Sequence, residues 1–190
     1  LSGSSSLFGF DKEEATSIEI GWKGRSEDGR MKGSVAAFSI AYDDRQIEYQ
    51  IEDPNGGGIV EGIVNLGDSK QFGFEADFAI RVNDYLDVTL SGGWVDAEWK
   101  GGTLAGGVDL SGKTPPVVPQ SGINLTADYL KPIANGRNMA ASLQVSRTGS
   151  YEGLQAWDPV TNPSYFLVNA QIGQTSDDWE LMLNIENLFD

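Results

Sequence analysis

Residues 71–82 alternate between apolar and polar side chains with a period of two. The apolar positions are Phe72, Phe74, Ala76, Phe78, Ile80 and Val82, and the positions between them include Glu75, Asp77 and Arg81. Successive side chains of a β-strand point to opposite faces, so this period predicts a strand with one apolar and one charged face. A chain built from such strands must place its two faces in two different environments.

The same alternation recurs in seven further segments, which predicts about eight strands and leaves little helical periodicity. These segments are 18–23, 31–42, 86–94, 123–129, 139–146, 166–172 and 179–186. In segment 31–42 the apolar set changes face near Ala37 and Phe38, which predicts a β-bulge at that point. The expected fold is therefore all-β and antiparallel.

The connections between the predicted strands alternate between short and long. The short ones are 25–30, 83–85, 131–138 and 174–178, and the long ones are a segment containing glycines 56–58, then 100–120 and 149–163. Bacterial membrane barrels have this arrangement, with short periplasmic turns and long outer loops. Four tryptophans near strand ends, Trp22, Trp94, Trp99 and Trp179, are typical of the aromatic girdles that border the lipid.

The composition excludes several classes of function. Lys and Arg total 13 against 28 for Asp and Glu, and this net charge of −15 disfavours nucleic acid as a partner. The chain contains no Cys and no His, which excludes thiol catalysis, Ser-His-Asp triads and common zinc sites. We interpret Glu75 and Asp77, two residues apart on one strand face, as part of a hydrated wall rather than a glycosidase pair. We expect no catalytic residue, metal site or cofactor, and hence no enzyme.

Several short motifs follow one another in a recognisable order. They are the segment 10–23, Phe38 with Tyr42-Asp43-Asp44, Asn65-Leu66-Gly67 with Gly73-Phe74-Glu75, the segments 86–97, 119–129 and 165–173, and Asn187-Leu188-Phe189-Asp190. Each motif is weak alone, but their order and spacing extend over nearly all of the chain. Together they resemble the C-terminal part of the β-barrel of TonB-dependent outer-membrane receptors.

This resemblance implies an antiparallel up-and-down transmembrane β-barrel segment, about eight strands of a larger plugged barrel. Residues 1–190 would be the C-terminal portion, with the plug domain and the N-terminal strands absent. The implied function is uptake of a bulky scarce nutrient, such as a ferric siderophore, cobalamin or an oligosaccharide, across the outer membrane of a Gram-negative bacterium. The implied partners are outer-membrane lipid, that small-molecule ligand, and a TonB-type energy-coupling protein acting through the missing plug.

In receptors of this family the ligand contacts come from the outer loops and the upper lumen. By resemblance, the candidate ligand-binding residues here are Trp99, Tyr151, Trp157 and Asp158. Aromatic rings would stack on sugars or catecholates, and acids or amides would hold hydroxyl groups. The acidic balance of the chain weighs slightly against an anionic ferric ligand.

Two other hypotheses stay open on the sequence. Eight strands can close into a complete small outer-membrane barrel, which would serve as an adhesin or a structural anchor. Eight strands can also form a soluble lipocalin-like carrier, in which the apolar face would point inward and the charged face outward.

Overall fold

A computed structural model describes residues 10–52, 58–101, 104–105, 108–153 and 160–189. Its long strands are β1 (Glu14–Arg25), β2 (Met31–Glu52), β3 (Ile59–Asn83), β4 (Leu86–Trp99), β7 (Ser121–Ile133), β8 (Arg137–Thr148), β11 (Tyr165–Thr175) and β12 (Glu180–Ile185). The short strands are β5 (Leu104–Ala105), β6 (Val108–Asp109), β9 (Tyr151–Glu152) and β10 (Thr161–Asn162). Among the described residues, no helix is long and apolar enough to cross a membrane.

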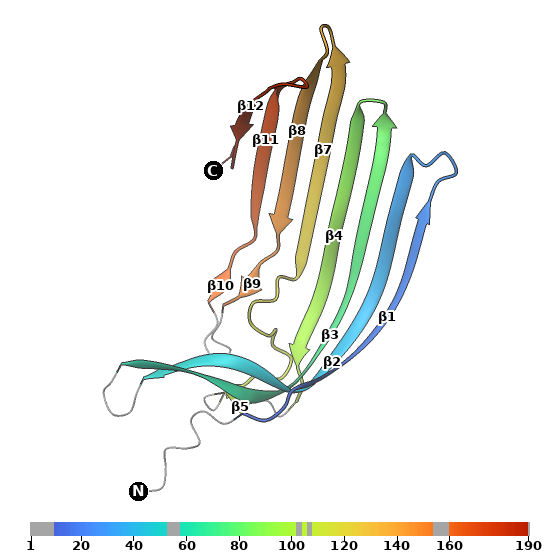
Figure 1. Cartoon of the computed structure of the whole chain (residues 1–190). Coiled ribbons are helices and arrows are strands. Elements are labelled where there is room, and N and C mark those ends of the chain that lie inside the picture. The colour runs from blue at the N-terminus through green and yellow to red at the C-terminus, as the bar shows by residue number, and fades with distance from the viewer. Residues whose placement is uncertain (1–9, 53–57, 102–103, 106–107, 154–159, 190) are drawn as a thin grey trace, which may run out of the picture.

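The eight long strands form one antiparallel sheet in the order β1-β2-β3-β4-β7-β8-β11-β12 (Figure 1). Each strand pairs with the next long strand along the chain, so the sheet is an up-and-down meander. The predicted all-β class and the eight predicted strands are thereby confirmed. In the described part of the chain, β1 and β12 are the two edges of the sheet.

The pairing register sorts the side chains into two faces. Paired residues on neighbouring strands project to the same side of a sheet. One such row crosses five strands and is wholly apolar, namely Phe78, Leu90, Leu125, Val145 and Val168. The adjacent row projects to the other side and consists of Asp77, Ser91, Asn124, Ser146 and Leu167. We call these two sides the apolar face and the polar face.

The register also measures how far the strands tilt. The row that starts at Arg25, the last residue of β1, reaches β11 at Asn169, six residues before that strand ends at Thr175. These six residues correspond to a stagger of about 20 Å along the strand direction. The row crosses six strand-to-strand spacings, which add up to about 29 Å across the sheet. If the short turns lie level along one rim, the strands tilt by about 35°, as in the wall of a barrel.

The middle of β2 departs from the prediction. The expected bulge near Ala37 and Phe38 is wrong, because pairing with β3 runs without interruption from Met31 to Tyr42. Phe38 lies on the polar face over Gly73, where an added Cβ would come within 2.5 Å of the phenylalanine ring. The ring thus fills the space that the glycine leaves open. An apolar side chain can therefore lie on the polar face here without a residue inserted into the strand.

The irregularity in β2 lies instead between Tyr42 and Gln46, where the pairing with β3 shifts register. Beyond this bulge both strands continue well past the predicted segments, β2 to Glu52 and β3 from Ile59. We call the hairpin formed by residues 45–52 and 59–67 the arm. Figure 1 shows that the arm bends away from the sheet and lies across the end that carries the long connections.

The largest fully buried side chains of the described residues lie at this same end. They are Trp99, Leu110, Pro115 and Ser69, and Ile47 of the arm packs with Trp99 and Leu110 in a small hydrophobic cluster. Trp99 pairs with Ser69 on the polar face, so its predicted place in a lipid-facing girdle is wrong. Trp22 and Trp94, in contrast, lie on the apolar face with exposures of 61% and 45%.

Candidate binding surface

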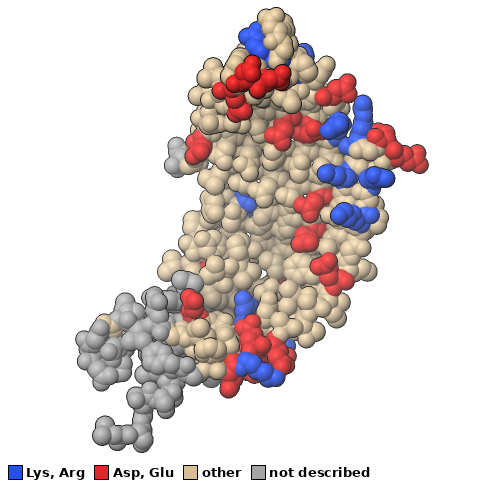
Figure 2. All heavy atoms as spheres, in the orientation of Figure 1, with Lys and Arg blue, Asp and Glu red and all other residues tan. Residues whose placement is uncertain are grey.

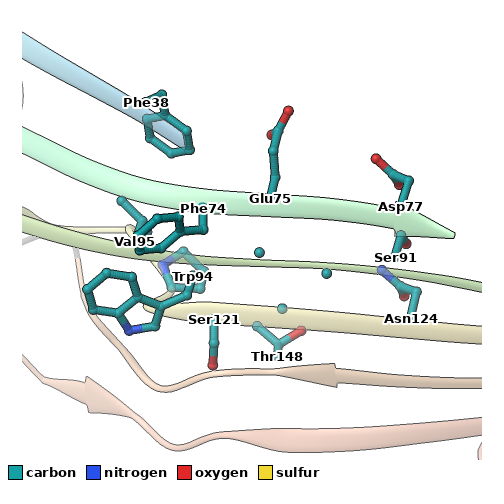
Figure 3. A pocket seen from close by; sticks show the side chains of 14 residues that line it. Phe38, Phe74, Glu75, Asp77, Ser91, Trp94, Val95, Ser121, Asn124 and Thr148 are labelled. Carbon is teal, nitrogen blue, oxygen red and sulfur yellow. The ribbon is translucent and has the colours of Figure 1, made fainter. Parts of the chain in front are cut away.

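A groove of about 500 Å³ hollows the polar face over β3, β4 and β7 (Figure 3). Gly93 and Gly122 pair with each other at its floor, and their missing side chains make the depression. Glu75 and Asp77 project from β3 along one wall, and Asn124 contributes an amide from β7. The groove therefore offers hydrogen-bond acceptors on one side and mixed donors and acceptors on the other.

Glu75 and Asp77 are exposed on the polar face, as expected for residues of a hydrated wall. Phe38 projects beside them and supplies an apolar edge to the same groove (Figure 3). This combination is not evident in the sequence, because the residues come from β2, β3, β4 and β7, which span a long stretch of the chain. A weak signal was present in the glycines at 92–93 and 122, which leave two facing strands without side chains.

Trp99 ends β4 beneath the arm and is only 1% exposed. The guanidinium carbon of Arg45 lies 5.7 Å from the centre of the Trp99 ring and 4.9 Å from the centre of the Tyr42 ring. Arg45 also donates a hydrogen bond from Nη1 to Ser69 Oγ at 3.2 Å. These cation–π contacts and this hydrogen bond tie the start of the arm to β3 and β4. In this arrangement Trp99 packs the base of the arm and offers little surface to a ligand.

A second set of contacts holds the segment before β1 against the arm. Asn65 Nδ2 donates to the backbone oxygens of Asp11 at 3.0 Å and Asp44 at 2.7 Å, while Asn65 Oδ1 accepts the Asp11 N–H at 2.7 Å. Gln46 Nε2 donates to the Asp11 oxygen at 2.8 Å, and the Gln46 N–H donates to Glu13 Oε2 at 2.6 Å. Asp44 adopts a left-handed backbone with φ of 54°, which makes the bend possible. We call these residues the Asn65 clamp.

The other predicted ligand-binding residues belong to the connection between β8 and β11. Tyr151 opens β9, is partly buried, and pairs with Asn162 of β10. Trp157 and Asp158 lie outside the described residues. Tyr151 and Trp99 are thus at the same end of the sheet, the one with the long connections, and a ligand-binding role for the four residues stays a prediction.

One carboxylate near this end is held in its ionised form by local hydrogen bonds. Ser111 donates to Asp109 Oδ1 from its hydroxyl at 2.5 Å and from its backbone N–H at 2.9 Å. These two bonds, the hydroxyl first, lower the pKa of Asp109 from its usual value. The loop between β4 and β7 therefore keeps a negative charge next to the buried Trp99 cluster.

Several solved structures with the same fold are receptors. The ferric yersiniabactin uptake receptor FyuA of Yersinia pestis aligns with a TM-score of 0.72 and 17% identity, covering 94% of this chain and 25% of that one. The ferric-catecholate import receptor Fiu of E. coli gives 0.65 and 21%, covering 95% and 24%. The siderophore receptor PirA of Acinetobacter baumannii gives 0.62 and 18%, covering 94% and 28%. The chain therefore spans about a quarter of the length of these receptors.

A comparison with curated proteins found no match. A family model described as "TonB dependent receptor-like, beta-barrel" matches residues 2–188, which is nearly the whole chain. The two-faced meander, its strand tilt and its alternating connections agree with that description. The chain belongs to the TonB-dependent receptor β-barrel family.

Proposed function

We propose that this chain forms the C-terminal portion of the barrel wall of an outer-membrane receptor that takes up a bulky scarce nutrient, such as a ferric siderophore. The observation that carries the proposal is the match of the whole eight-stranded, two-faced sheet to a receptor barrel family. In the complete receptor, the plug and the remaining strands would come from other parts of the polypeptide. A TonB-type protein would supply energy through the plug.

The apolar face supports the membrane part of this proposal. On β3 the apolar positions run from Phe72 to Val82, which is about 27 Å along the membrane normal at a tilt of about 35°. Lipid-facing bands of bacterial barrels are about 25 Å tall. An aromatic cluster of Phe72, Phe74 and Trp94 borders the band at one end, with Phe74 and Trp94 stacked at 6.2 Å between ring centres.

The opposite border of the band has the same chemistry. Tyr85 and Tyr129 meet edge to face there, with 6.5 Å between ring centres, next to a short turn. Lys131 places its ammonium 5.6 Å from the centre of the Tyr85 ring. Aromatic rings and a snorkelling cation are typical of the zone where lipid headgroups meet water. The apolar face thus has two aromatic borders at the spacing of a lipid core.

The polar face and the arm support the transport part. The groove beside Glu75 and Asp77 would face the water-filled lumen through which the ligand passes. Tyr151, Trp157 and Asp158 would contact the ligand at the outer mouth. Trp99 would act there by holding the arm in place, because its indole is buried.

The ligand class rests on the structural neighbours. FyuA is a ferric yersiniabactin uptake receptor, Fiu is a ferric-catecholate import receptor and PirA is a siderophore receptor. Cobalamin and oligosaccharides are the other ligand classes to test, because the barrel fold alone does not choose among them.

The experiment uses the complete receptor in an iron-starved Gram-negative strain that lacks its own siderophore receptors. Accumulation of radioactive iron is measured with a panel of ferric siderophores, and cobalamin and oligosaccharide uptake are measured in parallel. We expect uptake of one ligand class that stops in a matched strain without the TonB-type protein. Uptake of none of them, with cells that instead adhere to surfaces, would favour an adhesin and overturn the proposal.

A further inference from the structure

A cluster of cations occupies one end of the polar face, although the chain as a whole is strongly acidic. It consists of Lys23, Arg25, Arg30, Lys32 and Arg81, five of the 13 Lys and Arg residues in the sequence. Figure 2 shows Lys and Arg side chains gathered over the ends of β1 to β3, next to their short turns, with acidic side chains beside them and farther along the sheet. We call these five residues the basic patch.

The strand register sets like charges directly opposite each other within the basic patch. Arg25 of β1 pairs with Lys32 of β2. Arg30 lies opposite Arg81, because Met31 pairs with Ile80 and the Arg81 N–H donates to the Arg30 oxygen at 2.8 Å. Like charges at directly opposed positions destabilise an antiparallel pair. Two such rows side by side need a compensating negative charge.

The neighbouring carboxylates supply only part of that charge. Arg81 Nε lies 3.1 Å from Asp87 Oδ1 and forms an ion pair. Among the described residues, no ion pair joins Lys23, Arg25 or Lys32 to a carboxylate. Asp28 is close in sequence, but its Oδ1 accepts the Ser26 hydroxyl at 2.5 Å and the Arg30 N–H at 3.0 Å, so it is held within the turn.

Two adjoining grooves give the basic patch a shape that can hold a solute. One has a volume of about 330 Å³ and is lined by Arg30, Lys32, Arg81 and Asp87. The other has about 320 Å³ and is lined by Lys23, Lys32 and Asp77. Lys32 lines both grooves, so a bound solute could bridge them. These volumes lie at the lower end of the range for small-molecule sites.

We propose that the basic patch binds a small solute that carries at least two anionic oxygen groups, carboxylate or phosphate. One group would lie between Arg25 and Lys32 and the other near Arg30, where guanidinium donors can hold an oxyanion in a bidentate manner. Multivalency is required because the two rows of like charge stand side by side. The site rests on the polar face alone and does not depend on which nutrient the receptor takes up.

The test measures thermal unfolding of the purified complete receptor in detergent. Citrate and inorganic pyrophosphate are titrated separately, and sodium chloride keeps the ionic strength constant. The main variant carries Arg25→Gln together with Lys32→Gln. The matched control is Lys131→Gln, which removes a cation near a short turn on the apolar face, where Lys131 pairs with Met139.

We expect a saturable rise in the unfolding temperature of the wild type with at least one probe. The double variant should bind that probe at least tenfold more weakly, while the control retains wild-type affinity. Without probe, the double variant should unfold at the same temperature as the wild type or higher, because an unfavourable pair of charges has been removed. The two probes separate the carboxylate source from the phosphate source.

A wild-type receptor that shows no saturable shift with either probe would overturn the proposal. The same holds if the double variant keeps the full shift, or if Lys131→Gln abolishes it equally. Should the double variant fail to fold, Lys23→Gln is the second variant, since this exposed residue lines one groove and should weaken binding alone. Uptake plays no part in the readout, so a negative result here leaves the proposed transport function standing.

Discussion

The apolar face of the sheet and the base of the arm are held together by different kinds of interaction. On the apolar face, none of the five side chains in the row from Phe78 to Val168 is buried, and Leu90 of this row is 43% exposed. Phe74, on the same face, is 50% exposed. At the base of the arm, Trp99 is 1% exposed and Leu110 is fully buried. The first region depends on backbone pairing between the strands and, in the proposed receptor, on surrounding lipid. The second depends on individual contacts between side chains, so the two should respond differently to substitution.

The largest difference should come from Trp99→Ala. Removing a buried tryptophan from the small cluster should lower the free energy of unfolding by about 3–5 kcal/mol. Trp94→Ala, on the exposed apolar face, is the matched control and should cost clearly less. Denaturant unfolding of the complete receptor in detergent measures both, and equal losses would contradict the distinction between the two regions.

A charge placed in the middle of the lipid-facing band should rank second. Leu90→Arg should destabilise the folded barrel in vesicles by about 2–4 kcal/mol, the cost of a cation near the bilayer midplane. Thr89→Arg places the same side chain on the polar face, where water is available, and should be tolerated. Equal folding of the two variants into vesicles would contradict the assignment of the faces to lipid and lumen, and poorer folding of Thr89→Arg would reverse it.

Loss of the Asn65 clamp should have a smaller and local effect. Asn65→Ala removes two donated bonds and one accepted bond, at a cost of about 1–3 kcal/mol. Amide hydrogen exchange of the Asp11 N–H should become faster, while exchange in β8 stays unchanged. Asn124→Ala on the polar face is the control. Faster exchange throughout the sheet would show that the clamp is not a local device.

The smallest effect concerns the turn between β1 and β2. Hydrogen bonds from the Ser26 hydroxyl and then from the Arg30 N–H lower the pKa of Asp28. A lowered folded-state pKa means that this stabilisation is complete above the unfolded value of about 3.9 and is lost as the pH falls through the folded value. Ser26→Ala should therefore reduce the loss of stability that occurs as the pH falls below about 4. If Ser26→Ala and the wild type lost stability equally on acidification, Asp28 would not contribute to the pH dependence of stability.

Much of the two-faced sheet was predictable because its signal is local. Alternation such as Phe72, Phe74, Ala76 and Phe78 marks a strand and its faces without any knowledge of partners. The structure confirms the eight strands and their order, and the family match confirms the predicted resemblance. The candidate site was harder to predict from the sequence. The groove beside Glu75 joins residues of β2, β3, β4 and β7, and Trp157 and Asp158 lie outside the described residues.

The errors in the prediction share one cause. The bulge expected near Phe38 depends on what lies across the sheet, and only the register shows Gly73 beneath that ring. The sequence predicts Trp99 as an aromatic of the girdle that borders the lipid, whereas the arm folds over it and buries it with Leu110. In both cases a residue far away along the chain determines the environment of the side chain.

The sequence by itself determined the strands, their two chemically different faces and the alternation of short and long connections. These follow from residues one or two positions apart, because a strand repeats every two residues. Only the tertiary structure decided which cations face one another in the basic patch, where the bulge bends the arm, and which aromatic ring is buried. Those features follow from pairing between distant segments, and the pattern within one strand carries no information about its partner's register.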